Sequence, residues 1–294
     1  MQIERKPDWL KIKLEGGEHY SEIKQLVEKH QLHTICSSGK CPNMGKCWSM
    51  GTATFMILGD ICTRSCRFCA TTTGKPLPPD NNEPQKVAQS IRLMKLKHCV
   101  ITSVDRDDLP DKGAAHWAAT VHAIRQENPN IIIELLIPDY KGATLQTVLK
   151  AQPDIVAHNL ETVARLTPAV RSKATYSNSL NVLEQIAHTG FIAKTGIMVG
   201  LGETREEVVQ LLQEVIAAGC TMITIGQYLQ PTKTNISVAE YVHPDTFEFY
   251  KQTANALGYK SVESAPLVRS SYMAERSFLG AMMESQKITR IKES

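Results

Sequence analysis

Short apolar runs alternate with helical patterns through most of this chain, and this alternation constrains its fold more than any other feature. The helical patterns cover about 84–95, 115–127, 143–152, 178–189 and 205–218, and runs with the length of buried strands lie at 53–58, 98–102, 131–137, 154–159, 191–200 and 221–226. Strands that alternate with helices form parallel sheets with the helices packed on their faces. The sequence therefore predicts an α/β fold, an open or partial (β/α)6 parallel barrel.

Two segments flank the predicted barrel at 51–240. Residues 1–50 carry three cysteines and a helical pattern near 20–30, and residues 241–294 carry helical patterns near 245–257 and 272–284. No linker rich in Pro, Gly or Ser isolates either segment. We therefore expect N- and C-terminal extensions that pack on the barrel and form one compact unit with it.

The eight cysteines fall into two groups of three and two single residues. We call Cys36, Cys41 and Cys47 the first cysteine group, and Cys62, Cys66 and Cys69 of the stretch CTRSCRFC the second cysteine group. The second group directly follows the first predicted strand, and active sites of parallel barrels lie at the C-terminal ends of their strands. Cys99 and Cys220 start strands at the opposite end, which predicts that they are buried small side chains.

Several roles could explain grouped cysteines, namely core packing, disulfides, zinc binding or iron–sulfur clusters. A chain of 294 residues can bury a large core without disulfides. Its start, MQIERKPDWLKIKLEGG, lacks the apolar segment of a secretory signal, so we expect a cytoplasmic protein with reduced thiols. Structural zinc sites use four ligands, whereas each group offers three, which favours iron–sulfur clusters over zinc.

Charge and hydropathy exclude two classes of partner. The net charge of +3 arises from 33 basic and 30 acidic residues, a balance that argues against nucleic acid as the main partner. No stretch approaches the ~20 uninterrupted apolar residues that span a bilayer. We therefore expect neither nucleic-acid binding nor a membrane association.

The motif CxxxCxxC after the first strand resembles the radical S-adenosylmethionine (SAM) enzymes. The resemblance narrows to the lipoyl synthase family through CPNMGKCWSMGTATFMILGDICTRSCRFCA, ITSVDRDDLPD, IELLIPDY, HNLETV, GIMVGLGET, QYLQPT and RSSY, which follow the order found in that family. Three stretches depart from the family's usual pattern: SSGK within the first cysteine group, ATTTGKPLPP after Cys69, and KTNISV after QYLQPT. None of them changes an implied ligand.

The resemblance implies insertion of two sulfur atoms, at C6 and C8 of an octanoyl chain carried on a lysine of another protein. It also implies two [4Fe–4S] clusters and S-adenosylmethionine. One cluster binds S-adenosylmethionine, and the other, the donor cluster, is consumed as the source of sulfur. The implied ligands of the SAM-binding cluster are Cys62, Cys66 and Cys69, and those of the donor cluster are Cys36, Cys41, Cys47 and Ser271 of RSSY. From spacing alone, Ser271 could instead cap a following helix.

Four further residues are candidate contacts for S-adenosylmethionine: Ser103, Glu134, Asn159 and Arg171. Ser103 lies where the superfamily contacts the amino group of S-adenosylmethionine, Asn159 resembles a ribose contact, and Arg171 could pair with the methionine carboxylate. Each also has an ordinary structural interpretation. Ser103 could belong to a solvated turn in DRDDLPD, Asn159 could cap a strand end, and Arg171 could lie on the surface. Glu134 stands in an apolar strand, where a buried carboxylate needs either a partner or a ligand.

The implied partners are octanoylated lipoyl-carrier domains, such as E2 subunits of 2-oxoacid dehydrogenases and the H protein of glycine cleavage. An electron donor such as ferredoxin or flavodoxin is also implied. Two alternatives remain open at this point. One is another radical SAM enzyme that inserts sulfur, similar to biotin synthase or a methylthiotransferase. The other is an iron–sulfur protein that transfers electrons without catalysis.

Overall fold

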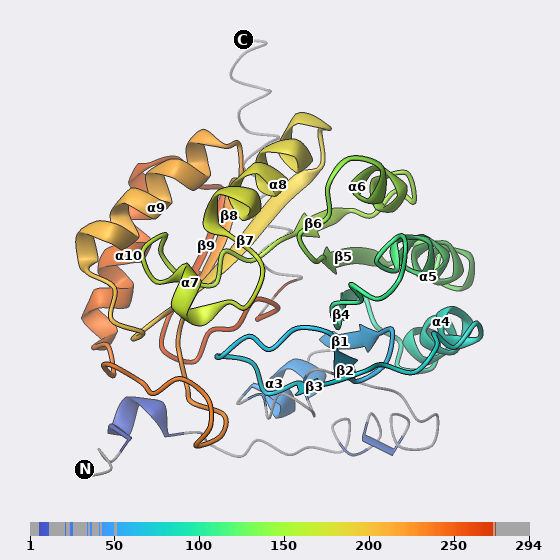
Figure 1. Cartoon of the computed structure of the whole chain (residues 1–294), viewed down its shortest axis with the longest axis horizontal. Helices are drawn as coiled ribbons and strands as arrows, with labels where there is room; N and C mark the ends of the chain where they lie inside the picture. The colour runs from blue at the N-terminus through green and yellow to red at the C-terminus, as the bar shows by residue number, and fades with distance from the viewer. Residues whose placement is uncertain are drawn as a thin grey trace.

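A seven-stranded parallel sheet organises the structure (Figure 1). The computed structural model describes residues 6–11, 21, 24, 25, 34, 36, 41, 43–49, 52–272 and 274. The strands, in their spatial order, are β1 (Thr52–Ile57), β4 (His98–Ser103), β5 (Ile132–Leu136), β6 (Ile155–Ala157), β7 (Ile192–Val199), β8 (Met222–Gln227) and β9 (Ser261–Ser264). All neighbouring strands run parallel. The six strands expected from the apolar runs are thereby confirmed.

The seventh strand, β9, is not predicted by the sequence pattern. Its residues, SVES, contain a single apolar side chain, so no apolar run marks it. It pairs with β8 from Met222↔Ser261 to Ile225↔Ser264 and so continues the sheet beyond the predicted barrel. The C-terminal segment therefore contributes a strand to the sheet. The division of the chain at residues 50 and 240 stays a prediction.

Helices cover the outer side of the sheet in an arc (Figure 1). They are α4 (Glu83–Leu93), α5 (Ala114–Glu127), α6 (Gly142–Leu149), α8 (Tyr176–His188), α9 (Arg205–Ala217) and α10 (Pro244–Ala256), with the short α7 (Thr167–Val170) between β6 and α8. The expected helices between the strands and the one near 245–257 are confirmed. Most of the expected helix near 20–30, and nearly all of the one at 272–284, lie outside the described residues. None of the helices in the described part of the chain has the length and apolar character needed to cross a bilayer.

The two single cysteines belong to the apolar core. Cys99, in β4, and Cys220, before β8, are fully buried. Burial raises the pKa of both thiols, and that of Cys220 reaches about 12. Such thiols stay protonated and unreactive, because the thiolate is the nucleophile and the metal ligand. Their predicted role as small buried side chains is confirmed.

Parts of the two terminal segments meet beside β1. Thr34 forms an antiparallel bridge with Phe55 of β1, and Trp48 of α3 (Met44–Ser49) is buried in the core. The Asn43 side chain donates a hydrogen bond of 2.6 Å to the carbonyl oxygen of Leu267. The segment with the first cysteine group is thus tied to the segment with the RSSY sequence, 224 residues away along the chain.

Residues 265–272, which we call the RSSY segment, lie directly on the backbone of β8. A Cβ atom built on Gly226 would overlap the carbonyl oxygen of Val268 and lie 3.0 Å from its carbonyl carbon. The carbonyl oxygen of Gln227, next in β8, accepts a hydrogen bond of 3.4 Å from Arg269. A glycine at position 226 is therefore required for this close approach.

We predict that Gly226→Ala displaces residues 265–272 and destabilises the protein by about 1–3 kcal/mol, the usual cost of overpacking. Urea unfolding gives the change in stability, and hydrogen exchange shows whether amides of this segment lose protection. Gly74→Ala is the control, because its Cβ would meet only a flexible Ile61 methyl group, at 3.3 Å. Wild-type stability and protection in Gly226→Ala would contradict this account.

Candidate active site

The second cysteine group lies in a loop at the C-terminal end of β1. Cys62 ends the two-residue strand β2 (Ile61–Cys62), which pairs with β3 (Thr72–Thr73) after the loop. The Cys62 sulfur accepts hydrogen bonds from the backbone N–H groups of Arg64 at 3.4 Å and Asp105 at 3.3 Å. Burial raises the pKa of the Cys62 thiol. The two N–H donors oppose that effect, since they stabilise a negatively charged sulfur.

The other two thiols of this group also have polar neighbours. The Cys69 sulfur accepts a hydrogen bond from the Thr71 N–H at 3.4 Å, and burial raises the pKa of this thiol too. The Cys66 sulfur lies 3.6 Å from the Ser172 hydroxyl oxygen. Ser172 also accepts a hydrogen bond of 3.2 Å from the Ser65 N–H, so this hydroxyl supports the loop at two points.

The cysteine loop offers three thiol side chains to an iron–sulfur cluster. In a four-iron cluster each thiolate would bind a different iron, so the three sulfur atoms would not need to meet at one point. Three thiolates would leave one iron for a small-molecule ligand.

The first cysteine group lines a separate hollow between the two terminal segments. Its lining consists of Cys36, Cys41, Asn43, Met44, Cys47, Thr52, Thr54, Arg269, Ser271 and Tyr272. The structure therefore brings Ser271 to the same hollow as the three cysteines, as the family resemblance implies. Whether its oxygen binds iron stays a prediction.

Burial and one cation set the electrostatics of this hollow. Burial raises the pKa of the Cys36 thiol, and the neighbouring Cys41 raises it further. Burial likewise raises the pKa of Cys41, against the attraction of the Arg269 charge. Burial in turn lowers the pKa of Arg269, and Cys41 opposes this shift. The guanidinium of Arg269 thus faces thiols that would become negatively charged on binding a metal.

Two of the predicted SAM contacts have a buried oxygen atom without a hydrogen-bond partner at the C-terminal edge of the sheet. The Ser103 hydroxyl oxygen, at the end of β4, and the Asn159 Oδ1, after β6, are buried without a hydrogen-bond partner among the described residues. Buried polar atoms in native proteins are nearly always paired, so these two oxygen atoms are able to accept hydrogen bonds from a ligand. A Cβ atom at Gly196 would lie 2.7 Å from the Thr224 hydroxyl oxygen and 2.9 Å from Asn159 Oδ1, too close for both side chains to keep their positions.

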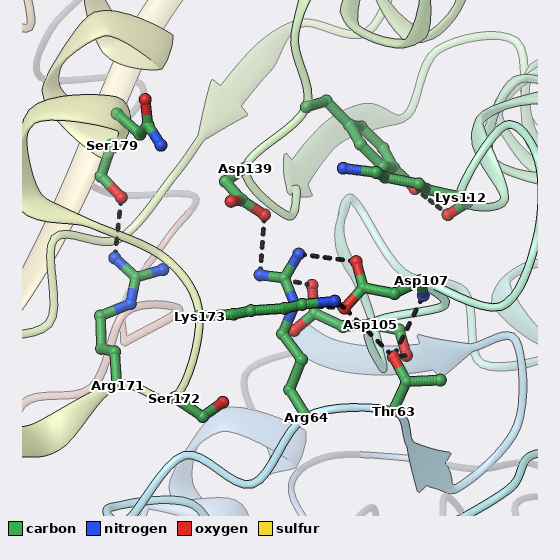
Figure 2. Close-up of polar contacts among 12 residues, drawn as sticks. Thr63, Arg64, Asp105, Asp107, Lys112, Asp139, Arg171, Ser172, Lys173 and Ser179 are labelled. Carbon is green, nitrogen blue, oxygen red and sulfur yellow. Dashed lines mark hydrogen bonds and ion pairs between the residues drawn. The ribbon is translucent and has the colours of Figure 1, made fainter. Parts of the chain in front are cut away.

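Arg171, the third predicted contact, is half-buried, and protein groups accept hydrogen bonds from its guanidinium. Its Nη1 donates hydrogen bonds of 2.8 Å to the Ser179 hydroxyl and 3.1 Å to the Asn159 carbonyl oxygen. The surface position that sequence alone allowed is therefore wrong. Figure 2 shows Arg171 extended toward Ser179 from the segment that also carries Ser172 and Lys173.

His158 fixes the proton arrangement behind Arg171. Its Nδ1 lies 2.9 Å from the Ile137 carbonyl oxygen, which can only accept, so Nδ1 carries the proton. Its Nε2 lies 2.9 Å from the Ser179 hydroxyl. Burial, followed by the nearby Arg171 charge, lowers the pKa of His158 to about 4. In the neutral ring Nε2 accepts from Ser179, and the Ser179 oxygen then accepts from Arg171.

Glu134, the fourth predicted contact, has protein partners. Its carboxylate lies 2.6 Å from Lys194 Nζ and 3.3 Å from His98 Nε2, all three side chains being buried. Burial alone would raise the pKa of Glu134, but the charge of Lys194 holds it below its ordinary value. Glu134 pairs with Val100 in mid-strand, well before the strand end at Ser103. The position of Glu134 favours a structural ion pair. A contact between Glu134 and S-adenosylmethionine stays a prediction.

The sequence reasoning missed the residue that connects the cysteine loop to its surroundings, Arg64. Figure 2 shows its guanidinium among the carboxylates of Asp105, Asp107 and Asp139. Hydrogen bonds from Arg64 hold the pKa of Asp107 well below its usual range, whereas burial raises the pKa of Asp105. The sequence DRDDLPD is therefore not simply a solvated loop. The sequence did contain a signal for this contact, because CTRSCRFC carries basic residues and DRDDLPD carries acidic ones.

We predict a pH-dependent loss of stability from His158. Its folded-state pKa of about 4 lies below the unfolded value near 6.5, so only the unfolded chain takes up this proton as the pH falls between those values. The contribution of neutral His158 to the free energy of unfolding is complete above pH ~6.5, and about 2 kcal/mol of it is lost by pH ~5. Urea unfolding of cluster-free wild type and His158→Gln measures this. The variant should lose about 2 kcal/mol less than wild type over this range, and parallel curves would contradict the assignment.

Comparison with known proteins identifies the family. The Radical SAM superfamily model matches residues 56–215. Lipoyl synthase of Parabacteroides distasonis is 62% identical over 274 residues, which cover 92% of this chain and 98% of that protein. Lipoyl synthase of Bacteroides fragilis is 60% identical over 274 residues, covering 92% and 95%.

The solved structures agree with this fold. Streptococcus suis SuiB bound to S-adenosylmethionine has a TM-score of 0.58 at 10% identity, covering 83% of this chain and 60% of that one. At this identity the likeness concerns the fold alone. The curated relatives match almost their full length, and they do not favour a biotin synthase-like enzyme or a non-catalytic electron carrier. The chain therefore belongs to the lipoyl synthase family of radical SAM enzymes.

Proposed function

We propose that the two cysteine groups hold two [4Fe–4S] clusters with separate tasks in lipoyl synthesis. Membership of the radical SAM superfamily implies one such cluster together with S-adenosylmethionine. The observation that carries the proposal of a second cluster is the hollow lined by the first cysteine group and Ser271. It lies apart from the loop of the second cysteine group and combines donors from both terminal segments.

The second cysteine group, Cys62, Cys66 and Cys69, would hold the SAM-binding cluster. When bound, this cluster and S-adenosylmethionine supply a one-electron cleavage that yields a carbon-centred radical able to abstract hydrogen. The protein's part is to orient the cofactor and exclude water. Ser103 and Asn159 offer unpaired oxygen atoms for this purpose. Arg171, held by Ser179, offers a fixed cation for a carboxylate.

The first cysteine group, Cys36, Cys41 and Cys47, would hold the cluster that provides both sulfur atoms for C6 and C8 of the octanoyl chain. Ser271 would complete its ligands through oxygen. A serine oxygen is a harder ligand than a thiolate, so we propose that its bond to iron is the one most easily released. Arg269, whose charge faces Cys41, would balance the negative charge of the bound cluster.

The substrate would be an octanoyl group on the lysine arm of a carrier domain, as in E2 subunits of 2-oxoacid dehydrogenases or the H protein. A ferredoxin or flavodoxin would supply the electrons. Both clusters need reduced thiols, so the proposed function would place the protein in the cytoplasm, where thiols stay reduced.

Substitution of one ligand in each group tests the division of tasks. We predict that Cys62→Ala abolishes formation of 5′-deoxyadenosine, whereas Cys41→Ala retains it and forms no lipoyl product. Anaerobically reconstituted protein with dithionite, S-adenosylmethionine and an octanoyl-lysyl peptide is followed by mass spectrometry. Cys220→Ala is the matched control, because this buried thiol lies outside both groups. Lipoyl product from Cys41→Ala would refute the donor role.

The same assay tests the serine ligand. Ser271→Ala should behave as Cys41→Ala does, with 5′-deoxyadenosine formed and the lipoyl product lost by more than about tenfold, which corresponds to ~1.4 kcal/mol. Ser271→Cys should keep iron near the wild-type content, since a thiolate is also an iron ligand. Ser270→Ala is the control from the same segment. Full lipoyl formation by Ser271→Ala would exclude a ligand role.

A further inference from the structure

Arg64 joins the cysteine loop to the ends of two neighbouring strands. Its side chain, only 5% exposed, points away from solvent although it stands between two predicted iron ligands. Its Nε and Nη2 donate hydrogen bonds of 2.8 and 2.9 Å to the two oxygens of Asp107. Its Nη1 lies 2.7 Å from Asp139 Oδ1 and 3.3 Å from Asp105 Oδ1.

The three carboxylates come from different parts of the site (Figure 2). Asp105 and Asp107 follow β4, the strand that ends at Ser103, and Asp139 follows β5. Asp107 also lies 3.1 Å from Lys173 Nζ, two residues after Arg171. The network therefore connects the cysteine loop with the segments that carry two predicted SAM contacts.

The geometry of these contacts requires arginine. A guanidinium presents five N–H donors in a planar fork, so it can bind one carboxylate with two parallel bonds and reach two more at its other edge. A lysine would keep the charge, but its single ammonium group cannot reproduce the fork. Removal of the cation would leave several acidic groups close together in a low-dielectric environment, where like charges repel strongly.

We propose that Arg64 is a positioning residue that fixes the cysteine loop relative to Ser103, at the end of β4, and Arg171, which follows α7. Its contacts set the loop in place before any cluster binds. Displacement of this loop would move the SAM-binding cluster away from Ser103 and Arg171, so that S-adenosylmethionine could no longer contact all of them at once and would bind more weakly. This inference rests on the assignment of the second cysteine group to the SAM-binding cluster and does not depend on the second cluster.

Arg64→Lys in the full-length reconstituted enzyme is the principal test. We expect KM for S-adenosylmethionine in 5′-deoxyadenosine formation to rise about tenfold or more, equivalent to ~1.4 kcal/mol, with a smaller fall in kcat. In the cluster-free chain, amides of residues 62–69 should exchange hydrogen faster than in wild type. The first readout reports cofactor placement, and the second is independent of iron.

Two matched arginines serve as controls. Arg106 makes a similar two-bond pair with Asp108, at 2.9 and 2.8 Å, and its third contact is the Leu58 carbonyl oxygen rather than the cysteine loop. Arg67 stands within the loop but is exposed. Arg106→Lys and Arg67→Lys should keep KM for S-adenosylmethionine within about twofold of wild type, below ~0.5 kcal/mol.

Asp107→Asn provides a second variant if Arg64→Lys fails to fold. This change removes the carboxylate that pairs with Arg64. Like Arg64→Lys, it should raise KM for S-adenosylmethionine and speed up hydrogen exchange in residues 62–69. Where both variants fold, the effect of the double variant should be smaller than the sum of the two single effects, because both changes break the Arg64–Asp107 pair. Loss of iron together with faster exchange in residues 62–69 also supports the proposal.

Several results would overturn it. Wild-type KM and wild-type exchange in Arg64→Lys, or in Asp107→Asn where the first variant does not fold, would do so. Loss of iron with unchanged exchange in the loop would show that Arg64 acts on the cluster directly and not by positioning. A Cys62→Ala protein that still cleaves S-adenosylmethionine would instead refute the cluster assignment on which the inference rests.

Discussion

The parallel direction of all seven strands is the constraint on which the rest of this structure depends. Because parallel strands end at the same edge of a sheet, residues that follow different strands become neighbours there. The cysteine loop follows β1, Asp105 and Asp107 follow β4, Asp139 follows β5, and Asn159 follows β6. The acidic residues bind the loop through Arg64, and the Ser103 and Asn159 oxygens lie buried at the same edge without a hydrogen-bond partner among the described residues. One edge thus combines the support of the cysteine loop with the proposed SAM contacts.

The terminal segments build the second site by a different principle. Neither is part of the six predicted strand–helix units, yet they meet through Asn43 and Leu267 beside β1. The close approach of Val268 to Gly226 fixes the RSSY segment on β8, the next-to-last strand in the order that begins with β1. Segments that are far apart in the sequence thus form one hollow, because both pack beside the folded sheet.

Sequence alone predicted what depends on local pattern. Apolar runs marked six strands, while β9 escaped because SVES has only one apolar residue. Cysteine spacing marked both groups. The pairing of Arg64 with Asp139, and that of Glu134 with Lys194 across 60 residues, could not be predicted, since charges along a sequence do not reveal which of them meet. The hydrogen bonds from Ile137 through His158 and Ser179 to Arg171 were missed for the same reason.

A crystal structure of the anaerobically reconstituted enzyme, with anomalous scattering recorded at the iron edge, tests the central claim most directly. The account predicts two separate iron sites. One lies at Cys62, Cys66 and Cys69, and the other lies in the hollow of the first cysteine group with the Ser271 oxygen bonded to iron. A single iron site, zinc in place of iron, or a Ser271 oxygen more than about 3 Å from every iron, beyond the bonding distance of first-row metals, would contradict it.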